Sequence, residues 1–383
     1  MPNSSNELLA HLVGVQTEGT PAPIDLLEIL RETPQGPSEL ARDRPISRKS
    51  VYSALDPLVE QFILVREKGD YALTGYGVVL CTALETATEP PTFDRAGVRF
   101  LLASTNRVAL LRTLRASPAR KAALANGEAS PSRTTVHRAI EAFTEKGWVT
   151  QNTTGQYTLT ETGERALVAF TRLLDDFEAA QSASTFLYCC DEAVADIPLD
   201  GLANAELHVD RPEAHDTSRG VLHELVTPEL DSFQGFLSSV STASADVGDS
   251  IIRSGTHTEL IIPEPVFYEL PTKGHYSEHV KRGLEAKNFD FFIVPNVESL
   301  PIGLAIFDGE TVLMSPANLN HVPPGGNAGT VVSSDEALVE WATALYTEYH
   351  AQAQTPGEHL IERLKEKLAE GASVLTRSNS MTD

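Results

Sequence analysis

The sequence contains one pattern twice, and this repeat is what most limits the fold of its first half. The matching segments are Ile24, Leu26, Leu27 and Leu30 with Val108, Leu110, Leu111 and Leu114; Ser47–Val51 with Ser132–Val136; Tyr71–Thr74 with Tyr157–Thr160; and Gly77 with Gly163. The offset rises only from 84 to 86 residues along the repeat. Similarity at several separate places with so little drift indicates a duplicated domain with small changes in loop length.

Each copy is predicted to form three helices and then a two-stranded hairpin. In the first copy we expect helices over Ile24–Arg31 and Pro37–Ala41, and a third helix that begins after the N-cap Ser47 and ends near Gln61. Pro57 lies inside this third helix and is expected to kink or shorten it. Strands are expected over Phe62–Glu67 and Tyr71–Thr74, around a tip formed by Lys68, Gly69 and Asp70.

The third helix of the second copy, from Ser130 to Ile140, is the predicted DNA-binding element. Its polar and basic side chains take the outward positions, while Val136, Ala139, Ile140 and Phe143 recur on one buried face. Such a helix can enter a DNA groove. The alternative is a surface helix with Ser130 or Ser132 as its N-cap. Strands over Trp148–Thr150 and Tyr157–Leu159 are expected to flank a polar tip, Gln151–Gln156.

The segments "GWVTQNTTGQYTLTETGERAL" and "FILVREKGDYALTGYGVVL" resemble the winged helix-turn-helix domains of prokaryotic transcription regulators of the ArsR and MarR type. The resemblance covers roughly residues 20 to 180 and implies double-stranded DNA as the partner. The helix residues that it implies are Ser132, Arg133, Thr134, Thr135, His137 and Arg138 in the second copy, and Ser47, Arg48, Lys49, Ser50 and Tyr52 in the first. The wing residues are Asn152, Thr153, Thr154 and Gln156, with Lys68 on the first wing.

The residue types suit DNA, because arginine can pair with guanine through two hydrogen bonds and hydroxyl groups can contact either strand. Two of the assignments have an alternative. The wings could instead be solvated hairpin tips, and His137 could be a partly buried histidine that reads no base.

The distribution of charge favours the second copy as the DNA-binding one. The chain has a formal net charge of -23, which by itself argues against nucleic acid as a partner. Residues 24–84 carry 7 basic and 9 acidic residues, whereas residues 95–174 carry 12 and 5. We therefore expect the second copy to dominate DNA affinity, and the first copy to assist it or to act as a packing module. The high acidic content, with more arginine than lysine, resembles the proteins of salt-loving archaea.

Nothing in the sequence indicates a membrane protein, a cofactor or a metal. We expect a cytoplasmic location, because there is no long apolar run and no signal-peptide pattern at the N-terminus. The three cysteines, Cys81, Cys189 and Cys190, match no zinc-binding pattern. We interpret them as buried, inert thiols, with a redox sensor at the adjacent pair as the alternative.

The predicted organisation has six parts. They are an N-terminal extension over 1–23 with little regular structure, two α+β winged helix domains over 24–90 and 95–163, a connecting helix over 164–184, an α/β domain over 185–352, and a tail over 353–383. The connecting helix carries an apolar seam of Leu167, Phe170, Leu174 and Phe177. This seam could form a homodimer, or it could pack on its own domain.

The C-terminal half alternates apolar runs of strand length with helical patterns, which indicates an α/β layer. Strands are expected at 258–263, 289–295, 303–308 and 311–315, helices at 228–241, 277–287 and 335–352, and a loop at 208–220. The segment from Ile306 to Asn318 resembles the end of the phospholipase D signature. However, the histidine and lysine slots of that signature hold Pro301 and Gly303, so the domain is interpreted as degenerate.

Degenerate domains of this kind resemble the effector modules of TrmB-type regulators. The pattern from "TELIIPEPVFYEL" to "VVSSDEALVEWATALYTEY" is similar to the middle domain of an archaeal regulator family first described for methanogen filamentation. This resemblance implies an α/β sensor domain for a small-molecule effector. The polar residues expected to bind it are Asp308, Ser315, Asn318, Asn320 and His321, which could alternatively form only a polar loop.

The leading hypothesis is a non-enzymatic, ligand-sensing transcription regulator. One alternative is a phosphodiesterase of the phospholipase D type that acts through His279 and Lys281. The other alternative is a protein-interaction adaptor whose winged helices bind no DNA.

Overall fold

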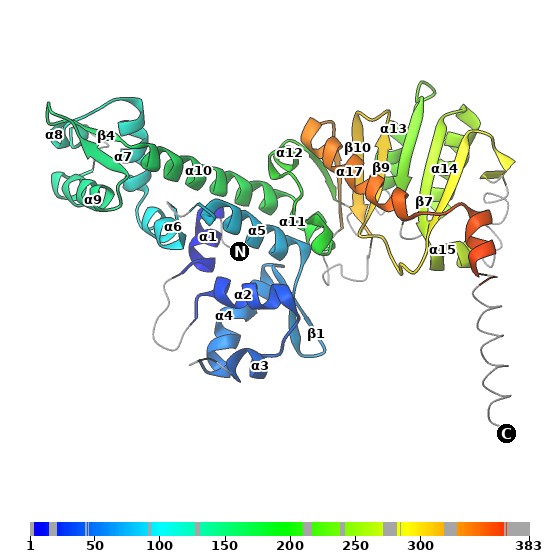
Figure 1. Ribbon diagram of the computed structural model, residues 1–383, viewed down its shortest axis with the longest axis horizontal. Coiled ribbons are helices and arrows are strands. Elements are labelled where there is room, and N and C mark those ends of the chain that lie inside the picture. The colour runs from blue at the N-terminus through cyan, green and yellow to red at the C-terminus, as the bar shows by residue number, and fades with distance from the viewer. Residues whose placement is uncertain are drawn as a thin grey trace. The chain divides into compact units, whose positions relative to one another are not determined.

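The computed structural model divides the chain into two compact units, residues 1–184 and 185–383, and each unit is described by itself (Figure 1). The structure describes residues 4–14, 21–42, 44, 46–90, 93–126, 131–209, 217–237, 242–270, 282–283, 285–317, 328–363 and 365. Both units mix helices with β-sheet, so the chain is a mixed α and β protein. No helix within these residues is long and apolar enough to span a membrane.

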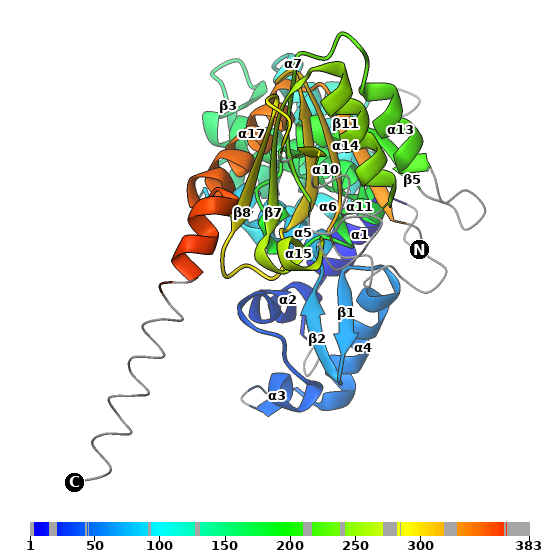
Figure 2. The ribbon, with the colours of Figure 1, turned by 90° about the vertical axis from the view of Figure 1, so that its right-hand side faces the viewer.

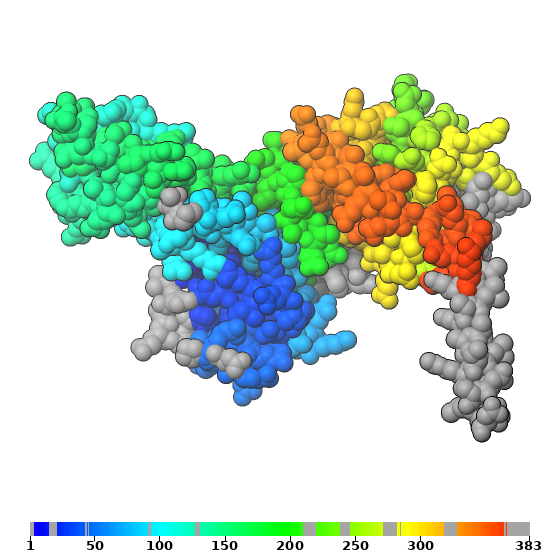
Figure 3. Space-filling view, in the orientation of Figure 1, coloured from blue at the N-terminus to red at the C-terminus, as the bar shows by residue number. Residues whose placement is uncertain are grey.

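The first unit contains the same succession of elements twice. The first copy consists of α1 (Ser5–Leu12), α2 (Pro23–Glu32), α3 (Pro37–Arg42), α4 (Arg48–Glu60), β1 (Leu64–Glu67), β2 (Asp70–Leu73) and α5 (Gly75–Thr88). The second copy consists of α6 (Arg95–Leu102), α7 (Thr105–Ala116), α8 (Lys121–Leu124), α9 (Arg133–Glu145), β3 (Val149–Gln151), β4 (Tyr157–Leu159) and α10 (Glu161–Ser182). Figure 3 shows the first copy in blue and the second in cyan to green.

The two copies share hydrogen bonds at equivalent positions. The hydroxyl of Ser47 accepts from the Ser50 N–H at 3.1 Å, and that of Ser132 accepts from the Thr135 N–H at 3.2 Å, so the same cap begins α4 and α9. The backbone of Tyr71 pairs with that of Gln35, as the backbone of Tyr157 pairs with that of Ala119. The sequence repeat is therefore a structural repeat.

Gly77 and Gly163 are glycines because the backbone of the residue just before the first strand of each hairpin lies against them. A Cβ atom at Gly77 would lie 2.3 Å from the carbonyl oxygen of Ile63, and one at Gly163 would lie 2.1 Å from that of Trp148. Each glycine N–H also donates to a threonine hydroxyl, Thr74 or Thr160, at 3.1 Å. This close approach fixes how the hairpin of each copy leads into its last helix.

The prediction of little regular structure over residues 1–23 is wrong at α1. Ser4 caps this helix, and Leu8, Leu9 and Leu12 are buried on its inner face. The helix packs on α10 and also contacts α2 and α6. It precedes α2 in the chain as α6 precedes α7, so the shared order of elements begins before the matching sequence segments do.

Helix α4 continues through Pro57 to Glu60, so the proline does not shorten it. Leu55 and Leu58, on either side of the proline, are both fully buried and hold the helix on the core.

The apolar seam of α10 packs inside its own unit. Leu167, Phe170 and Phe177 are buried, together with Leu173, and α10 lies along α5 and also contacts α1 and α7. Of the two interpretations of the seam, packing on its own domain is the one that the structure favours. The buried members of the seam are therefore not available to a second chain.

The second unit is built on a seven-stranded mixed sheet with the order β5-β11-β10-β9-β6-β7-β8. The strands are β5 (Glu206–Val209), β6 (Ser232–Phe236), β7 (His257–Pro263), β8 (Phe289–Val294), β9 (Ile302–Phe307), β10 (Thr311–Pro316) and β11 (Gly329–Ser333). Strands β6, β7 and β8 are parallel to one another, and the remaining neighbours are antiparallel. Every residue of β9, near the centre of the sheet, is buried.

Helices cover both faces of this sheet (Figure 2). The helical elements after α10 are α11 (Ser184–Leu187), a 3₁₀ turn (Glu192–Val194), α12 (Leu199–Ala203), α13 (Thr217–Leu225), α14 (Thr242–Ser254), α15 (Glu264–Glu269) and α17 (Glu336–Gln352). Helices α13 and α14 pack on a core that contains Phe233, Phe307 and Leu313. Helix α17 packs across β6, β8, β9 and β10, with Leu338, Ala342 and Tyr346 buried.

Two predictions for this unit are wrong. The segment 228–241 is not a helix, because it contains the strand β6, which pairs with β7 and β9. Gly235 allows the close pairing with β9, since a Cβ atom there would lie 2.4 Å from the Leu304 carbonyl oxygen. The loop predicted at 208–220 is bounded by regular structure, with β5 at its start and α13 at its end. Most of the helix predicted at 277–287 lies outside the described residues.

Candidate nucleic-acid interface

Helix α9 buries one face and presents the other to solvent. Val136, Ala139, Ile140 and Phe143 are buried, as the spacing predicts. The ring of Phe143 stacks on Trp148, with 6.3 Å between centroids, and meets Phe100 edge-on at 5.8 Å. This aromatic contact fixes the helix on the unit, so the side chains on its outer face have a defined position.

Two arginines on the outer face of α9 are available for a partner. Arg133 and Arg138 are exposed, and neither forms an ion pair within the described part of the chain. Thr134, between them in the sequence, is also exposed. Unpaired guanidinium groups on one helix face can bind phosphate or the edge of guanine without first breaking an internal ion pair.

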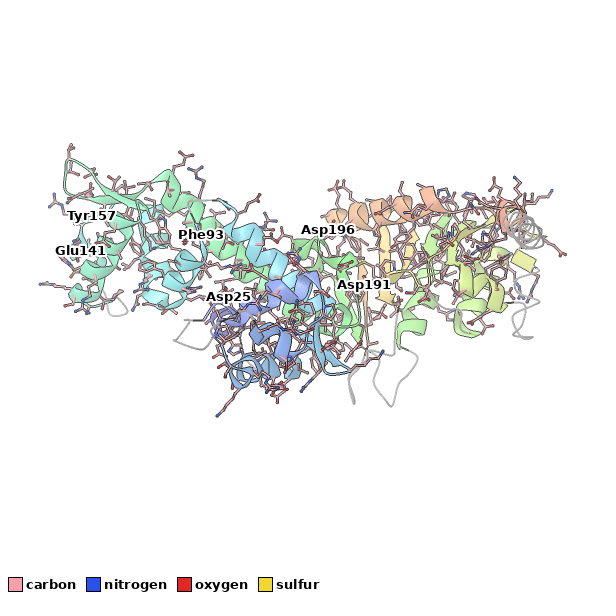
Figure 4. The ribbon with its side chains drawn as sticks, turned by 60° about the horizontal axis from the view of Figure 1, so that its bottom comes forward. Asp25, Phe93, Glu141, Tyr157, Asp191 and Asp196 are labelled. Carbon is pink, nitrogen blue, oxygen red and sulfur yellow. The ribbon has the colours of Figure 1, made fainter. Side chains whose placement is uncertain are left out.

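His137 is accessible, which excludes the alternative of a buried histidine. Its side chain is 57% exposed, and its Nδ1 lies 3.1 Å from a carboxylate oxygen of Glu141, one turn further along α9 (Figure 4). The hydroxyls of Ser132 and Thr135 lie 2.9 Å apart and take part in the helix cap. These two residues therefore position α9 and offer less to a partner than the arginines do.

The polar residues of the second hairpin tip mostly bind one another. The Asn152 Oδ1 accepts from the N–H of Thr154 at 3.1 Å, from its hydroxyl at 2.7 Å, and from the N–H of Gln156 at 2.9 Å. Gln156 also donates to the carbonyl of Pro118 at 3.4 Å. The side chains of Asn152, Thr154 and Gln156 thus hold the shape of the tip, and the exposed Thr153 takes no part in these hydrogen bonds.

The predicted residues of the first copy are placed equivalently but are less free. Arg48 lies 3.5 Å from the Ser38 hydroxyl, and Ser47 and Ser50 form the cap of α4. The ring of Tyr52 is covered by the Arg66 guanidinium at 5.4 Å. Lys49 and Lys68 are exposed, and Lys68 sits at the hairpin tip with φ of 52°.

Among the basic residues of the second copy that were not predicted as site residues are Arg112, Arg120, Lys121 and Lys146. Arg112 is exposed on α7, and Lys146 follows α9, with its ammonium over the rings of Phe100 and Trp148. The Arg120 guanidinium donates to the Thr154 carbonyl at 3.0 Å, and the Lys121 ammonium lies over the Tyr157 ring at 5.4 Å. Arg120 and Lys121 therefore flank the hairpin at the start of α8. The excess of basic residues over 95–174 indicated a basic region. It could not indicate that these two residues lie beside the hairpin, because their positions depend on the fold.

The ligand site predicted for the second unit does not assemble from its described members. Asp308 sits in the turn between β9 and β10, where its Oδ1 accepts from the backbone N–H groups of Asp231 at 3.1 Å and Ser232 at 2.8 Å. Ser315 pairs with Gly303 at the other end of the same hairpin. Asp308 is therefore a structural residue. Asn318, Asn320 and His321 lie outside the described residues, as do His279 and Lys281.

A different polar cluster lies at the carboxyl ends of β7 and β8. The Glu264 carboxylate is almost buried and accepts from the Arg363 guanidinium and from the N–H of Asn296 at 3.1 Å, with His359 at 3.6 Å. Burial by itself raises the pKa of Glu264, but hydrogen bonds from Arg363 and Asn296 and the nearby positive charges outweigh it and lower the pKa below its usual 4.5.

A small cavity of about 70 Å³ adjoins this cluster and is lined by Pro295, Asn296, Gln354, His359, Glu362 and Arg363. The last four of these residues follow the predicted tail boundary at 353, so a segment beyond the sheet completes this polar site.

The cysteines are free and buried. Burial raises the pKa of Cys81 to about 12 and that of Cys189 to about 11, and the pKa of Cys190 is also well above its usual value. High pKa values keep thiols protonated and unreactive, which favours the interpretation as inert thiols. The described residues hold no group of three or more side chains suited to a metal ion.

Two family models match the chain. The N-terminal domain model of HVO_A0261 matches residues 95–182, and the middle domain model of the methanogenesis regulatory protein FilR1 matches residues 219–352. The chain is therefore similar to these two families over two separate segments, neither of which is half of its length. The HVO_A0261-type match spans α6 to α10, which is the second copy of the repeat, and the FilR1-type match spans α13 to α17.

No curated protein matches the sequence. Among solved structures, the archaeal chromatin protein TrmBL2 aligns at 14% identity over 65% of this chain and 92% of its own, with a TM-score of 0.30. Nuc from Salmonella typhimurium, a phospholipase D family member, and NucT from Helicobacter pylori each align at 12% identity over 39% of this chain, covering 97% and 98% of their own, with TM-scores of 0.30 and 0.31. Scores of this size carry no argument about function, so the function must be inferred from the family models and the chain's own residues.

Proposed function

We propose that this protein is a DNA-binding transcription regulator that contacts duplex DNA through α9 and the hairpin β3–β4. In this proposal both copies are winged helix-turn-helix domains, with α8 and α9 as the helix-turn-helix and the hairpin as the wing. The observation that carries it is the pair of exposed arginines, Arg133 and Arg138, which form no ion pair with any residue that the structure describes, on the outer face of a helix held by its Ser132 cap and its aromatic contacts. The match to a regulator family supports the same conclusion.

The FilR1-type domain is proposed to sense an effector that changes DNA binding. The support is the polar cluster around Glu264 with its cavity, because ligands of open α/β sheets bind beyond the carboxyl ends of parallel strands. Asp308 is not part of this proposal, since the backbone of Asp231 and Ser232 occupies its carboxylate. A homodimer stays a prediction that the α10 seam does not support.

We expect the double variant Arg133→Ala, Arg138→Ala to bind a mixed-sequence 40-base-pair duplex at least about 100-fold more weakly than the wild type. Each arginine contact with a base or phosphate contributes about 1–3 kcal/mol. Fluorescence anisotropy of the full-length chain with labelled duplex, repeated over a series of KCl concentrations, measures the affinity and its salt dependence.

The matched control is Arg172→Ala, Arg253→Ala, which removes the same charge from exposed positions on α10 and α14. This control should keep affinity within about threefold of the wild type, since neither arginine lies on α9 or the hairpin. Equal losses in both double variants would show that affinity follows net charge alone, and the assignment of α9 would then be wrong.

A further inference from the structure

We propose that each chain has one DNA-binding copy, the second, and that the first copy contacts no DNA and serves as a support for it. This inference rests on the proposed function and concerns which of two similar domains performs it. Because the two copies share their caps, strand pairs and glycine contacts, their positions can be compared one by one.

The first copy has no cation at the positions where the second copy has the most useful ones. The second-copy residues Arg112, Arg120, Lys121, Arg138 and Lys146 correspond to Glu28, Gly36, Pro37, Ser53 and Gln61. The equivalence is fixed by structure at both ends of the third helix, since Ser47 and Ser132 are its N-caps and Gln61 and Lys146 its C-caps. A surface without these cations binds the phosphate backbone poorly.

The charge beside the hairpin is reversed in the first copy. Asp70, on the first hairpin, has its Oδ1 2.9 Å from where a Cβ atom of Gly36 would lie. At the equivalent place in the second copy, the Arg120 guanidinium reaches the Thr154 carbonyl beside Gln156. A phosphate group that Arg120 would attract would therefore meet a carboxylate in the first copy.

Of the two cations of the first hairpin, Lys68 is exposed at the tip and Arg66 is occupied by packing. The Arg66 guanidinium lies over the rings of both Tyr52 and Tyr71, at 5.4 and 5.3 Å. The Tyr71 hydroxyl in turn donates to the Asp56 carboxylate at 2.5 Å. Tyr52 corresponds to the exposed His137, so the outer face of α4 is closed by its own hairpin where that of α9 is open.

The first copy is instead tied to the second. Arg95, on α6, pairs with Asp25 at 3.3 Å and with Glu28, and both carboxylates belong to α2. Glu28 is the residue that corresponds to the exposed Arg112. Helix α5 of the first copy also packs along α10 of the second. In the first copy, the face of α2 that corresponds to the exposed Arg112 face of α7 therefore contacts the second copy through Arg95.

The test compares Arg133→Ala with Arg48→Ala in the full-length chain, because these arginines are at the same place in α9 and α4. The probe is the mixed-sequence duplex. We expect Arg133→Ala to lower affinity about tenfold and to reduce the slope of log affinity against log salt by about one. Arg48→Ala should leave affinity within twofold and the slope unchanged.

A second pair of variants guards against a role of Arg133 in folding. Arg120→Ala, Lys121→Ala should reduce the salt slope by up to about two, while Gly36→Arg should leave affinity unchanged because the first copy meets no DNA. Equal losses from Arg48→Ala and Arg133→Ala would overturn the inference and leave the proposed function standing. If the wild-type chain binds no duplex at any salt concentration, the proposed function fails and this inference fails with it.

Discussion

Replacing Gly163 by alanine is expected to destabilise the first unit by at least about 3 kcal/mol. The new Cβ atom would lie 2.1 Å from the carbonyl oxygen of Trp148 and 2.8 Å from its carbonyl carbon, so the start of α10 must move away from the backbone just before β3. That movement also weakens the cap formed by the Thr160 hydroxyl, which itself donates to the Gly147 carbonyl at 2.6 Å. The contacting atoms belong to the backbone of Trp148, which cannot shift as easily as the end of a flexible side chain. The expected loss of stability is therefore large.

Urea unfolding of the full-length chain measures this loss. The chain has two tryptophans, Trp148 in the first unit and Trp341 in the second, so a Trp341→Phe background leaves Trp148 as the reporter of the first unit. Gly77→Ala should cause a similar loss, because its Cβ would lie 2.3 Å from the Ile63 carbonyl oxygen. The control is Gly248→Ala on α14 of the second unit, where a Cβ atom meets nothing within 4 Å, and its stability is read from Trp341 in a Trp148→Phe background. If Gly163→Ala lost no more stability than this control, close contact with the Trp148 backbone would not be the reason that residue 163 is a glycine.

Glu264→Gln is expected to destabilise the second unit by about 2–3 kcal/mol at neutral pH. The substitution keeps the shape of the side chain but removes the charge that balances Arg363 and His359. Loss of one partner from a buried ion pair leaves the other uncompensated. The Arg363 side chain is 35% exposed, and water there reduces the penalty, so the expected value is at the low end for such pairs.

This effect should depend on pH in a defined direction. The pKa of Glu264 is lower in the folded chain than its usual 4.5, so the unfolded chain binds the proton more readily. The stabilisation is therefore complete above about pH 4.5 and is lost as the pH falls through the folded pKa. The difference in unfolding free energy between wild type and Glu264→Gln should be largest at neutral pH and shrink on acidification.

The fluorescence of Trp341 in a Trp148→Phe background follows the second unit in this experiment. Glu340→Gln is the control, because Glu340 is exposed on α17 and forms no ion pair within the described residues. It should change stability by less than about 0.5 kcal/mol at every pH. A Glu264→Gln difference that stayed constant from pH 7 down to pH 3 would show that the carboxylate charge is not what stabilises the cluster.

Local sequence signals predicted most of the repeat. The N-caps Ser47 and Ser132, the buried face of α9 and the strands beside each hairpin tip are encoded within a few residues, and the structure has all of them. Such features can be read without knowing the fold, since caps, periodicity and turn residues act over short distances. The match of Gly77 with Gly163 was part of the repeat, but the close backbone contact at each glycine was found only in the structure.

The features that the sequence did not predict depend on contacts between distant segments. Strand β6 lies in a segment with a helix-like pattern and is a strand because β7 and β9 pair with it on both sides. Helix α1 is short, and its burial against α10 stabilises it. Glu264 and Arg363 meet across 99 residues of sequence. No local pattern could have indicated that pair. Asp308 has a side chain suited to ligand binding, but its carboxylate accepts hydrogen bonds from the backbone N–H groups of Asp231 and Ser232.

The most direct test of the proposed DNA-binding surface is acetylation of lysines in the full-length wild-type chain, with and without the mixed-sequence duplex. Each copy offers two lysines, Lys49 and Lys68 in the first and Lys121 and Lys146 in the second. We expect DNA to protect Lys121 and Lys146 from acetylation, as read by mass spectrometry, and to leave Lys49 and Lys68 as reactive as in the free chain. Equal reactivity of Lys121 and Lys146 with and without bound DNA would contradict the proposal that α9 and its hairpin form the DNA-binding surface.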